Sequence, residues 1–123
     1  MEGEGFLPVD VKPLMVTAVS PVDETKGVGR GKNVKATFSE DVNPATVTTS
    51  TLELQISGTT TPIDAKVSYD SASRTAMLDP YGGSATLLKS CKWYTARVTT
   101  GIKDKAGNPL AEDKVWSFKT SGC

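Results

Sequence analysis

The sequence predicts an all-β sandwich of about seven antiparallel strands joined by Greek-key connections. Three observations predict this fold class. Short segments alternate between apolar and polar residues, which is the period of a strand with one buried face. Clusters of Gly, Pro, Asn and Asp separate these segments at intervals of ~8–12 residues, the spacing of turns in a sandwich. No long segment shows the periodicity of an amphipathic helix.

The length and composition are those of one ordinary globular domain. The chain has 123 residues, of which 37% are hydrophobic and 23% charged. This length suits a single core and is short for two domains. Gly and Pro interrupt the start of the chain, so residues 1–13 are expected to be a flexible lead-in or linker and residues 14–123 the sandwich domain.

The first four alternating segments are expected at residues 15–19, 33–38, 52–56 and 63–69. The first stops at Ser20-Pro21, and the Gly-rich stretch that follows is interpreted as a loop with a short edge strand near Val28. After the second segment, Asn43-Pro44 predicts a single helical turn, because Asn is a favoured N-cap and Pro suits the first helical position.

The last three alternating segments are expected at residues 74–79, 94–98 and 115–119. The first of them follows a turn at residues 70–73 and ends at Pro80. In the last segment, Trp116 and Phe118 are two positions apart and therefore lie on one face of a strand. Burial in the core is the preferred interpretation for this pair, rather than an exposed platform for sugars.

Charge and residue types exclude several classes of function. Lys+Arg and Asp+Glu both number 14, and no basic run is present, so nucleic-acid and membrane partners are not expected. Histidine is absent, which removes the commonest general base and metal ligand, and an enzyme is therefore not expected. The N-terminus lacks the features of a signal peptide, so the chain is either cytosolic or a piece whose export signal lies elsewhere; the second is preferred.

Three segments in order carry a family resemblance. They are FSEDVNPATV at residues 38–47, the strand led by Tyr94, and DKAGN at residues 104–108 followed by WSFKT at residues 116–120. This set resembles the bacterial Ig-like domains first described in S-layer proteins. The resemblance implies a seven-stranded Ig-like sandwich without catalytic residues.

The same resemblance implies a place and a role for the chain. Such domains are modules of secreted or cell-surface proteins, so an extracellular or cell-surface location is expected. They serve as spacers, as structural or adhesion units, or as accessory domains that bind carbohydrate beside an enzyme. The expected partners are neighbouring domains of a larger chain, with a cell-wall or extracellular polysaccharide or a protein as a further partner. In isolation the chain is expected to be a monomer.

Tyr94 opens the next-to-last predicted strand after Leu88 and a turn. This is the place of a tyrosine corner, whose hydroxyl group ties the preceding loop to the strand. The alternative is an ordinary core tyrosine with its hydroxyl group at the rim. The family usually has a small turn residue, often Gly, where Cys91 stands.

Two further features have competing interpretations. Asp104, Gly107 and Asn108 fit a tight turn, because Asp accepts backbone hydrogen bonds and the other two tolerate positive φ. The alternative is a calcium site in which Asp104 is joined by other acidic residues, namely Glu112 and Asp113 with Glu40 and Asp41. The turn is preferred, because the ligand spacing of an EF-hand is missing. Trp93 is expected on the solvent face, as a covered surface residue or, less favoured, as a ligand contact together with Tyr81.

The two cysteines flank the last predicted hairpin. Pairing Val98 with Trp116 and Ala96 with Phe118 keeps inward residues opposite one another, and this register places Cys91 opposite Cys123. A disulfide would then close the hairpin, in keeping with an oxidising compartment. Two free thiols, one of them at a frayed terminus, are the alternative.

Overall fold

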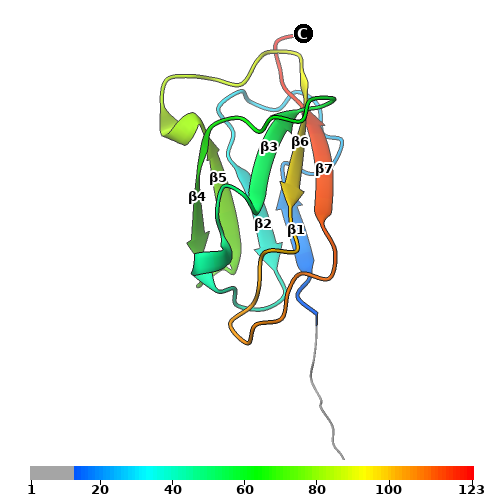
Figure 1. Cartoon of the computed structure of the whole chain (residues 1–123). Coiled ribbons are helices and arrows are strands. Elements are labelled where there is room, and N and C mark those ends of the chain that lie inside the picture. The colour runs from blue at the N-terminus through cyan, green and yellow to red at the C-terminus, as the bar shows by residue number, and fades with distance from the viewer. Residues whose placement is uncertain (1–12) are drawn as a thin grey trace, which may run out of the picture.

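The fold consists of two β-sheets packed face to face (Figure 1). The computed structural model describes residues 13–123. The predicted lead-in over residues 1–13 therefore lies outside the described residues except for Pro13. None of the helices in the described part is long and apolar enough to cross a membrane.

In the part of the chain that the structure describes, seven strands form these sheets, and each pair of neighbouring strands is antiparallel. Their bounds are β1 Val16–Ser20, β2 Val34–Phe38, β3 Leu52–Ile56, β4 Ala65–Asp70, β5 Thr75–Pro80, β6 Trp93–Val98 and β7 Lys114–Lys119. One sheet has the order β1-β2-β5-β4 and the other β3-β6-β7. The chain passes from one sheet to the other between β2 and β3, β3 and β4, and β5 and β6. The predicted all-β Ig-like sandwich is confirmed.

The core lies between the sheets because alternate residues of the strands point inward. The largest fully buried side chains come from both sheets and from the connecting segments. They are Leu14, Val34, Phe38, Val42, Leu52, Leu54, Leu78, Leu88, Tyr94, Ile102, Trp116 and Phe118. Burial of Trp116 and Phe118 agrees with the expectation of an inward pair. The indole Nε1 of Trp116 is buried without a hydrogen-bond partner.

Two short 3-10 turns lie between the strands, and β1 differs slightly from its predicted bounds. A 3-10 turn, η1, covers Pro44–Thr46, and the Asn43 side chain accepts a hydrogen bond from the Ala45 N–H, as the N-cap prediction required. A second one, η2, covers Tyr81–Gly83. The first strand begins one residue later than predicted and contains a bulge between Val16 and Ala18, because two of its residues face one register position of β2.

The outer edge of β7 is covered by the segment Asp23–Val28. The Val28 N–H donates to the Lys119 carbonyl at 3.1 Å, and the Lys119 N–H donates to the Thr25 carbonyl at 2.8 Å. The short edge strand expected near Val28 is present only as a single parallel bridge to Thr120. This cover satisfies backbone groups that would otherwise be open to another chain.

The predicted register of the last hairpin is wrong by two residues. Ala96 pairs with Trp116 and Tyr94 with Phe118, so paired residue numbers add to 212 and not to 214. Both registers keep inward residues opposite inward residues, because a slip of two preserves the face of every side chain. The observed register also places two aromatic rings, Tyr94 and Phe118, side by side with their centroids 6.1 Å apart.

Candidate functional site

The end of the sandwich at the start of β6 is closed by Tyr94. Its hydroxyl group accepts a hydrogen bond of 2.8 Å from the Lys89 N–H, five residues upstream, while the ring is fully buried. Burial raises the pKa of the Tyr94 hydroxyl group, since the phenolate would lose its hydration. This arrangement is that of the tyrosine corner described for such sandwiches. It holds the loop before β6 against the core.

A disulfide between Cys91 and Cys123 closes the same end, with the two Cα atoms 4.7 Å apart. The observed register places Cys91 opposite Ser121, whose carbonyl accepts a bond of 2.9 Å from the Cys91 N–H. The bond to Cys123 is therefore made by the chain beyond the paired strands and not by directly opposed residues. Cys91 has φ of 55°, a left-handed conformation that Gly adopts easily, which accounts for the small residue usual at this position.

The buried hydroxyl group of Thr120 joins the loop before β6 to the end of β7. Its hydroxyl group donates to the Lys89 carbonyl at 2.6 Å and accepts from the Lys92 N–H at 3.0 Å. Only 1% of this residue is exposed, so these bonds satisfy a hydroxyl group that would be costly to bury alone. Tyr94, Thr120 and the disulfide together make this end of the sandwich a rigid support.

The opposite end contains the turn formed by Asp104–Asn108. One carboxylate oxygen of Asp104 accepts hydrogen bonds from the Ala106 N–H at 3.0 Å and the Asn108 N–H at 2.8 Å, and the other accepts from the Asn108 side chain at 3.2 Å. Gly107 has φ of 89°, which only Gly adopts at little cost. Asp104 is 6% exposed, and its two carboxylate oxygens accept hydrogen bonds from groups of the turn.

A network of three side chains connects this turn to β4. The Tyr69 hydroxyl group donates to Asp41 at 2.6 Å and accepts from the Val42 N–H at 2.8 Å, and the Lys105 ammonium lies 3.1 Å from Asp41. The Tyr69 hydrogen bond, followed by Lys105, lowers the pKa of Asp41. Burial, followed by the bond to Asp41, raises the pKa of Tyr69.

Two of the acidic residues that the calcium interpretation needed are engaged in contacts within the protein. Asp41 is engaged with a hydroxyl group and an ammonium group, and Asp104 with backbone N–H groups. Within residues 13–123, no three Asp, Glu, His or Cys side chains form a group suited to a metal ion. The local structure is therefore accounted for by turn chemistry.

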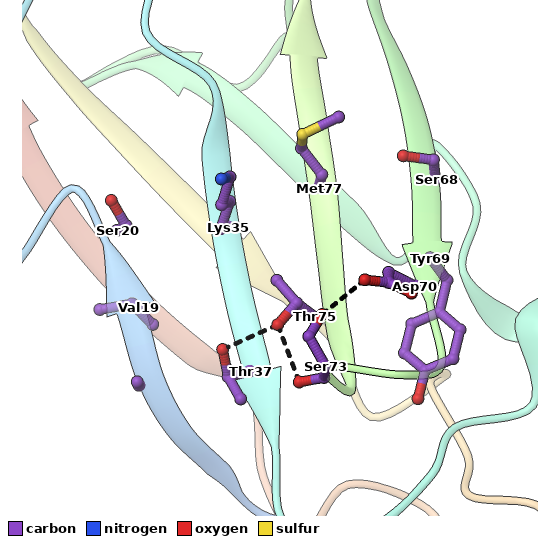
Figure 2. Close-up of a pocket in the computed structure, with 11 residues that line it drawn as sticks. Val19, Ser20, Lys35, Thr37, Ser68, Tyr69, Asp70, Ser73, Thr75 and Met77 are labelled. Atoms are coloured by element: carbon purple, nitrogen blue, oxygen red, sulfur yellow. Dashed lines mark hydrogen bonds between the residues drawn. The ribbon is translucent and has the colours of Figure 1, made fainter.

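A partly open groove of about 440 Å³ lies on the outer face of the four-stranded sheet (Figure 2). Its lining comes from all four strands and includes Lys35 and Asp70 as charged residues. A row of hydroxyl groups crosses it, in which Thr37 and Thr75 are 3.1 Å apart and Ser73 donates to Asp70 at 2.9 Å. The groove therefore presents hydroxyl donors and acceptors, one cation and one anion to a ligand.

Sequence reasoning did not predict this groove. Alternation placed Lys35, Thr37 and Ser68 on outward faces, but it could not show that β2 lies beside β5 and β5 beside β4. Figure 2 shows the ring of Tyr69 turned away from the hydroxyl row, so the groove has no aromatic platform at that position.

The two aromatic residues considered as ligand contacts do not come from one surface. Trp93 opens β6 in the three-stranded sheet, is half-buried and pairs with Lys119. Tyr81 follows β5 of the other sheet and packs against the core cluster. Trp93 lies on the face of β6 opposite to that of Tyr94, whose side chain points inward.

Comparison with known families decides what this sandwich is. The family model described as bacterial Ig-like domain matches residues 10–120. The chain belongs to the bacterial Ig-like domain family. Its matched region includes all the segments of the sequence resemblance, namely residues 38–47, the strand led by Tyr94, and residues 104–108 with residues 116–120. No curated protein matches the chain.

Solved structures with the same fold have varied roles. The S-layer protein rSbsC is 23% identical with a TM-score of 0.63, over 89% of this chain and 14% of that one. PcoC, a methionine-rich copper resistance protein from Escherichia coli, is 13% identical with a TM-score of 0.69, over 89% and 100%. The LD transpeptidase LdtMt1 is 17% identical with a TM-score of 0.56, over 86% and 39%. These likenesses concern the fold, since one fold supports many functions.

Proposed function

We propose that this domain is a non-catalytic module of a secreted or cell-surface bacterial protein, where it separates and orients neighbouring domains. One observation carries the proposal: β1 begins at one end of the sandwich, and the C-terminus lies at the opposite end (Figure 1). Domains connected in this way are arranged one after another, so that each adds its long dimension to the whole.

The disulfide supports this role because it would carry a pulling force applied to the C-terminus. A pull on the C-terminus reaches Cys123 and passes through the covalent bond directly to Cys91. The hairpin of β6 and β7 lies between these residues in sequence and is bypassed. The bond also fits an oxidising, extracellular compartment. The family and the S-layer likeness support the same location.

Absence of catalysis is inferred from residue chemistry. The sequence has no His, so nucleophilic sets that depend on His cannot form. The hydroxyl groups in the groove pair with one another and with Asp70, whose carboxylate also accepts the Ala72 N–H. The Ser73–Asp70 contact is thus accounted for by the turn that joins β4 to β5.

Force spectroscopy tests the spacer role directly. The chain is stretched between handles at its two ends, with and without a reductant. A spacer is expected to unfold in one event, and the oxidised domain should release roughly 115 Å less chain than the reduced one, because 32 residues at ~3.6 Å each stay closed by the disulfide. Stepwise unfolding at low force, or equal extension in both conditions, would contradict the proposal.

A second candidate is an accessory carbohydrate-binding domain, which the hydroxyl-lined groove favours. Saccharides are recognised by arrays of hydroxyl, amide and charged groups such as those around Thr37 and Thr75. Titration with soluble bacterial polysaccharides, followed by NMR chemical shifts, tests it. Shifts confined to the groove and weakened by Lys35→Ala would support binding there; no shift, or shifts around Trp93 alone, would reject the groove.

A further inference from the structure

We propose that β4 is a self-pairing edge, through which two copies of this chain associate by antiparallel strand addition. The two-fold axis of the pair would pass between the Ser68 residues of the two copies. This proposal is separate from the spacer role, because it concerns the side of the sandwich and not its ends.

The first observation is an open row of backbone groups. Among the strands of residues 13–123, β4 is the last of its sheet and pairs only with β5. The Tyr81 N–H donates to the Asp64 carbonyl, so even-numbered residues from Asp64 onward direct their backbone groups to β5. Ala65, Val67 and Tyr69 therefore direct theirs away from the sheet. In the described range, 13–123, no loop supplies hydrogen bonds to these three residues.

Other edges of the sandwich are protected, which distinguishes β4. Segment Asp23–Val28 covers β7, as described above. The edge of β3 receives a hydrogen bond of 2.8 Å from the Ile63 N–H to the Leu54 carbonyl. The edge strand β1 contains a bulge, a common device against edge pairing. β4 has a regular register with β5 over all six of its residues.

The second observation is that the charges along β4 are self-complementary. Lys66, Ser68 and Asp70 are exposed on the outer face, with the cation near the start and the anion at the end. An antiparallel pair centred on Ser68 places Lys66 opposite Asp70 of the partner subunit, twice by symmetry. Directly opposed unlike charges stabilise a strand pair and like charges destabilise it.

The inner face agrees with this register. Val67 would lie opposite Tyr69 of the partner subunit, and an aromatic residue beside a β-branched one is a favourable cross-strand pair. The backbone N–H and C=O groups of Val67 and Tyr69 also point away from the sheet. In this register they would form the backbone hydrogen bonds between the two copies. A small residue, Ser68, lies at the axis, where the side chains of the two strands approach most closely.

Charge also selects against the neighbouring register. If the pair were centred on Val67, Lys66 would face Ser68 of the partner subunit and Asp64 would face Asp70 of the partner subunit. Two like-charge contacts would replace two unlike ones. The charges therefore favour the register centred on Ser68 over that centred on Val67. In the favoured arrangement, two four-stranded sheets join and their grooves open on the same side.

The test is charge reversal with rescue, measured by sedimentation. The wild type should show a concentration-dependent rise from 13.0 kDa toward twice that mass at up to about 1 mM, the range for so small an interface. Lys66→Asp and Asp70→Lys should each remain monomeric. A mixture of these two variants, and the double variant alone, should associate again, since each restores opposite charges. Lys35→Asp, on the same face but away from the edge, should behave as the wild type.

Two further readouts keep the test decisive. Asp70 also accepts turn bonds from Ala72 and Ser73, so circular dichroism must show that Asp70→Lys is folded. If it is not, Lys66→Asp and wild-type hydrogen exchange decide the matter. The amides of Val67 and Tyr69 should gain protection with concentration, and Lys66→Asp should abolish the gain. A wild type monomeric throughout, or association unchanged by Lys66→Asp, would overturn the proposal.

Discussion

Cys91 and Cys123 are joined although they do not face each other in the strand register. Cys91 shares a backbone hydrogen bond with Ser121, and the disulfide reaches two residues further along the chain. The cross-link therefore fastens the C-terminal segment beyond β7 to the loop before β6. It adds a covalent tie where the backbone ladder has ended.

Removing this disulfide is expected to lower the free energy of unfolding by roughly 3–4 kcal/mol, because it closes a loop of 32 residues in the unfolded chain. Urea unfolding of the wild type and of the Cys91→Ser/Cys123→Ser variant measures the difference. The reduced wild type should resemble the variant. Titration of the denatured, unreduced protein should find no free thiol, and two thiols per chain would contradict the cross-link.

Tyr94→Phe is expected to destabilise the domain by about 1–2 kcal/mol, because the Lys89 N–H loses its acceptor while the ring stays in place. Tyr81→Phe is the matched control, since no hydrogen bond of the Tyr81 hydroxyl group is present in the described structure. Denaturant midpoints of both variants check the difference. Equal effects at the two positions would show that the Tyr94 hydroxyl group has no special role.

Asp104→Ala should cost about 1–3 kcal/mol, because two backbone N–H groups of the turn lose their acceptor. Asp104→Asn keeps an acceptor oxygen and should lose much less. If the acidic residues serve only the fold, the melting temperature will be the same with calcium and with a chelator. A rise with calcium that Asp104→Ala removes would instead support the metal interpretation.

Acid should weaken the network of Asp41, Tyr69 and Lys105. The pKa of Asp41 is lower in the folded protein than its ordinary value of 3.8. Its contribution is thus fully present above the unfolded pKa and is lost as pH falls through the folded pKa. Between pH 6 and pH 2, the free energy of unfolding should fall less steeply for Asp41→Asn than for the wild type. Identical slopes would show that Asp41 is not coupled to folding.

Alkali should act through Tyr69 and Tyr94, whose pKa values are raised above 10.0 by burial. Stability from these groups is complete below the unfolded pKa and is lost as pH rises through the folded pKa. Tyr69→Phe, which cannot ionise, should remove part of the alkaline loss. Spectroscopic titration at 295 nm of the wild type and of Tyr69→Phe isolates the ionisation of Tyr69, which should occur above pH 10.0; ionisation at or below that value would contradict this.

The sequence by itself determined the strands and the inward face of each. Alternation is local, so it located β2, β3, β6 and the Trp116–Phe118 pair without knowledge of their neighbours. The Asn43 cap and the Asp104 turn were equally readable, because each depends on residues only a few positions apart. The family resemblance added the seven-stranded Ig-like sandwich, without an order of strands in the sheets.

The tertiary structure decided what depends on residues far apart in the chain. The observed register of the last hairpin differs from the predicted one by two residues, because alternation with a period of two cannot distinguish such slips. In the observed register, Tyr94 packs on Phe118. The groove required four strands to lie side by side, and the network of Asp41, Tyr69 and Lys105 joined two loops and a strand. The open edge of β4 could be recognised only once its sheet had an order.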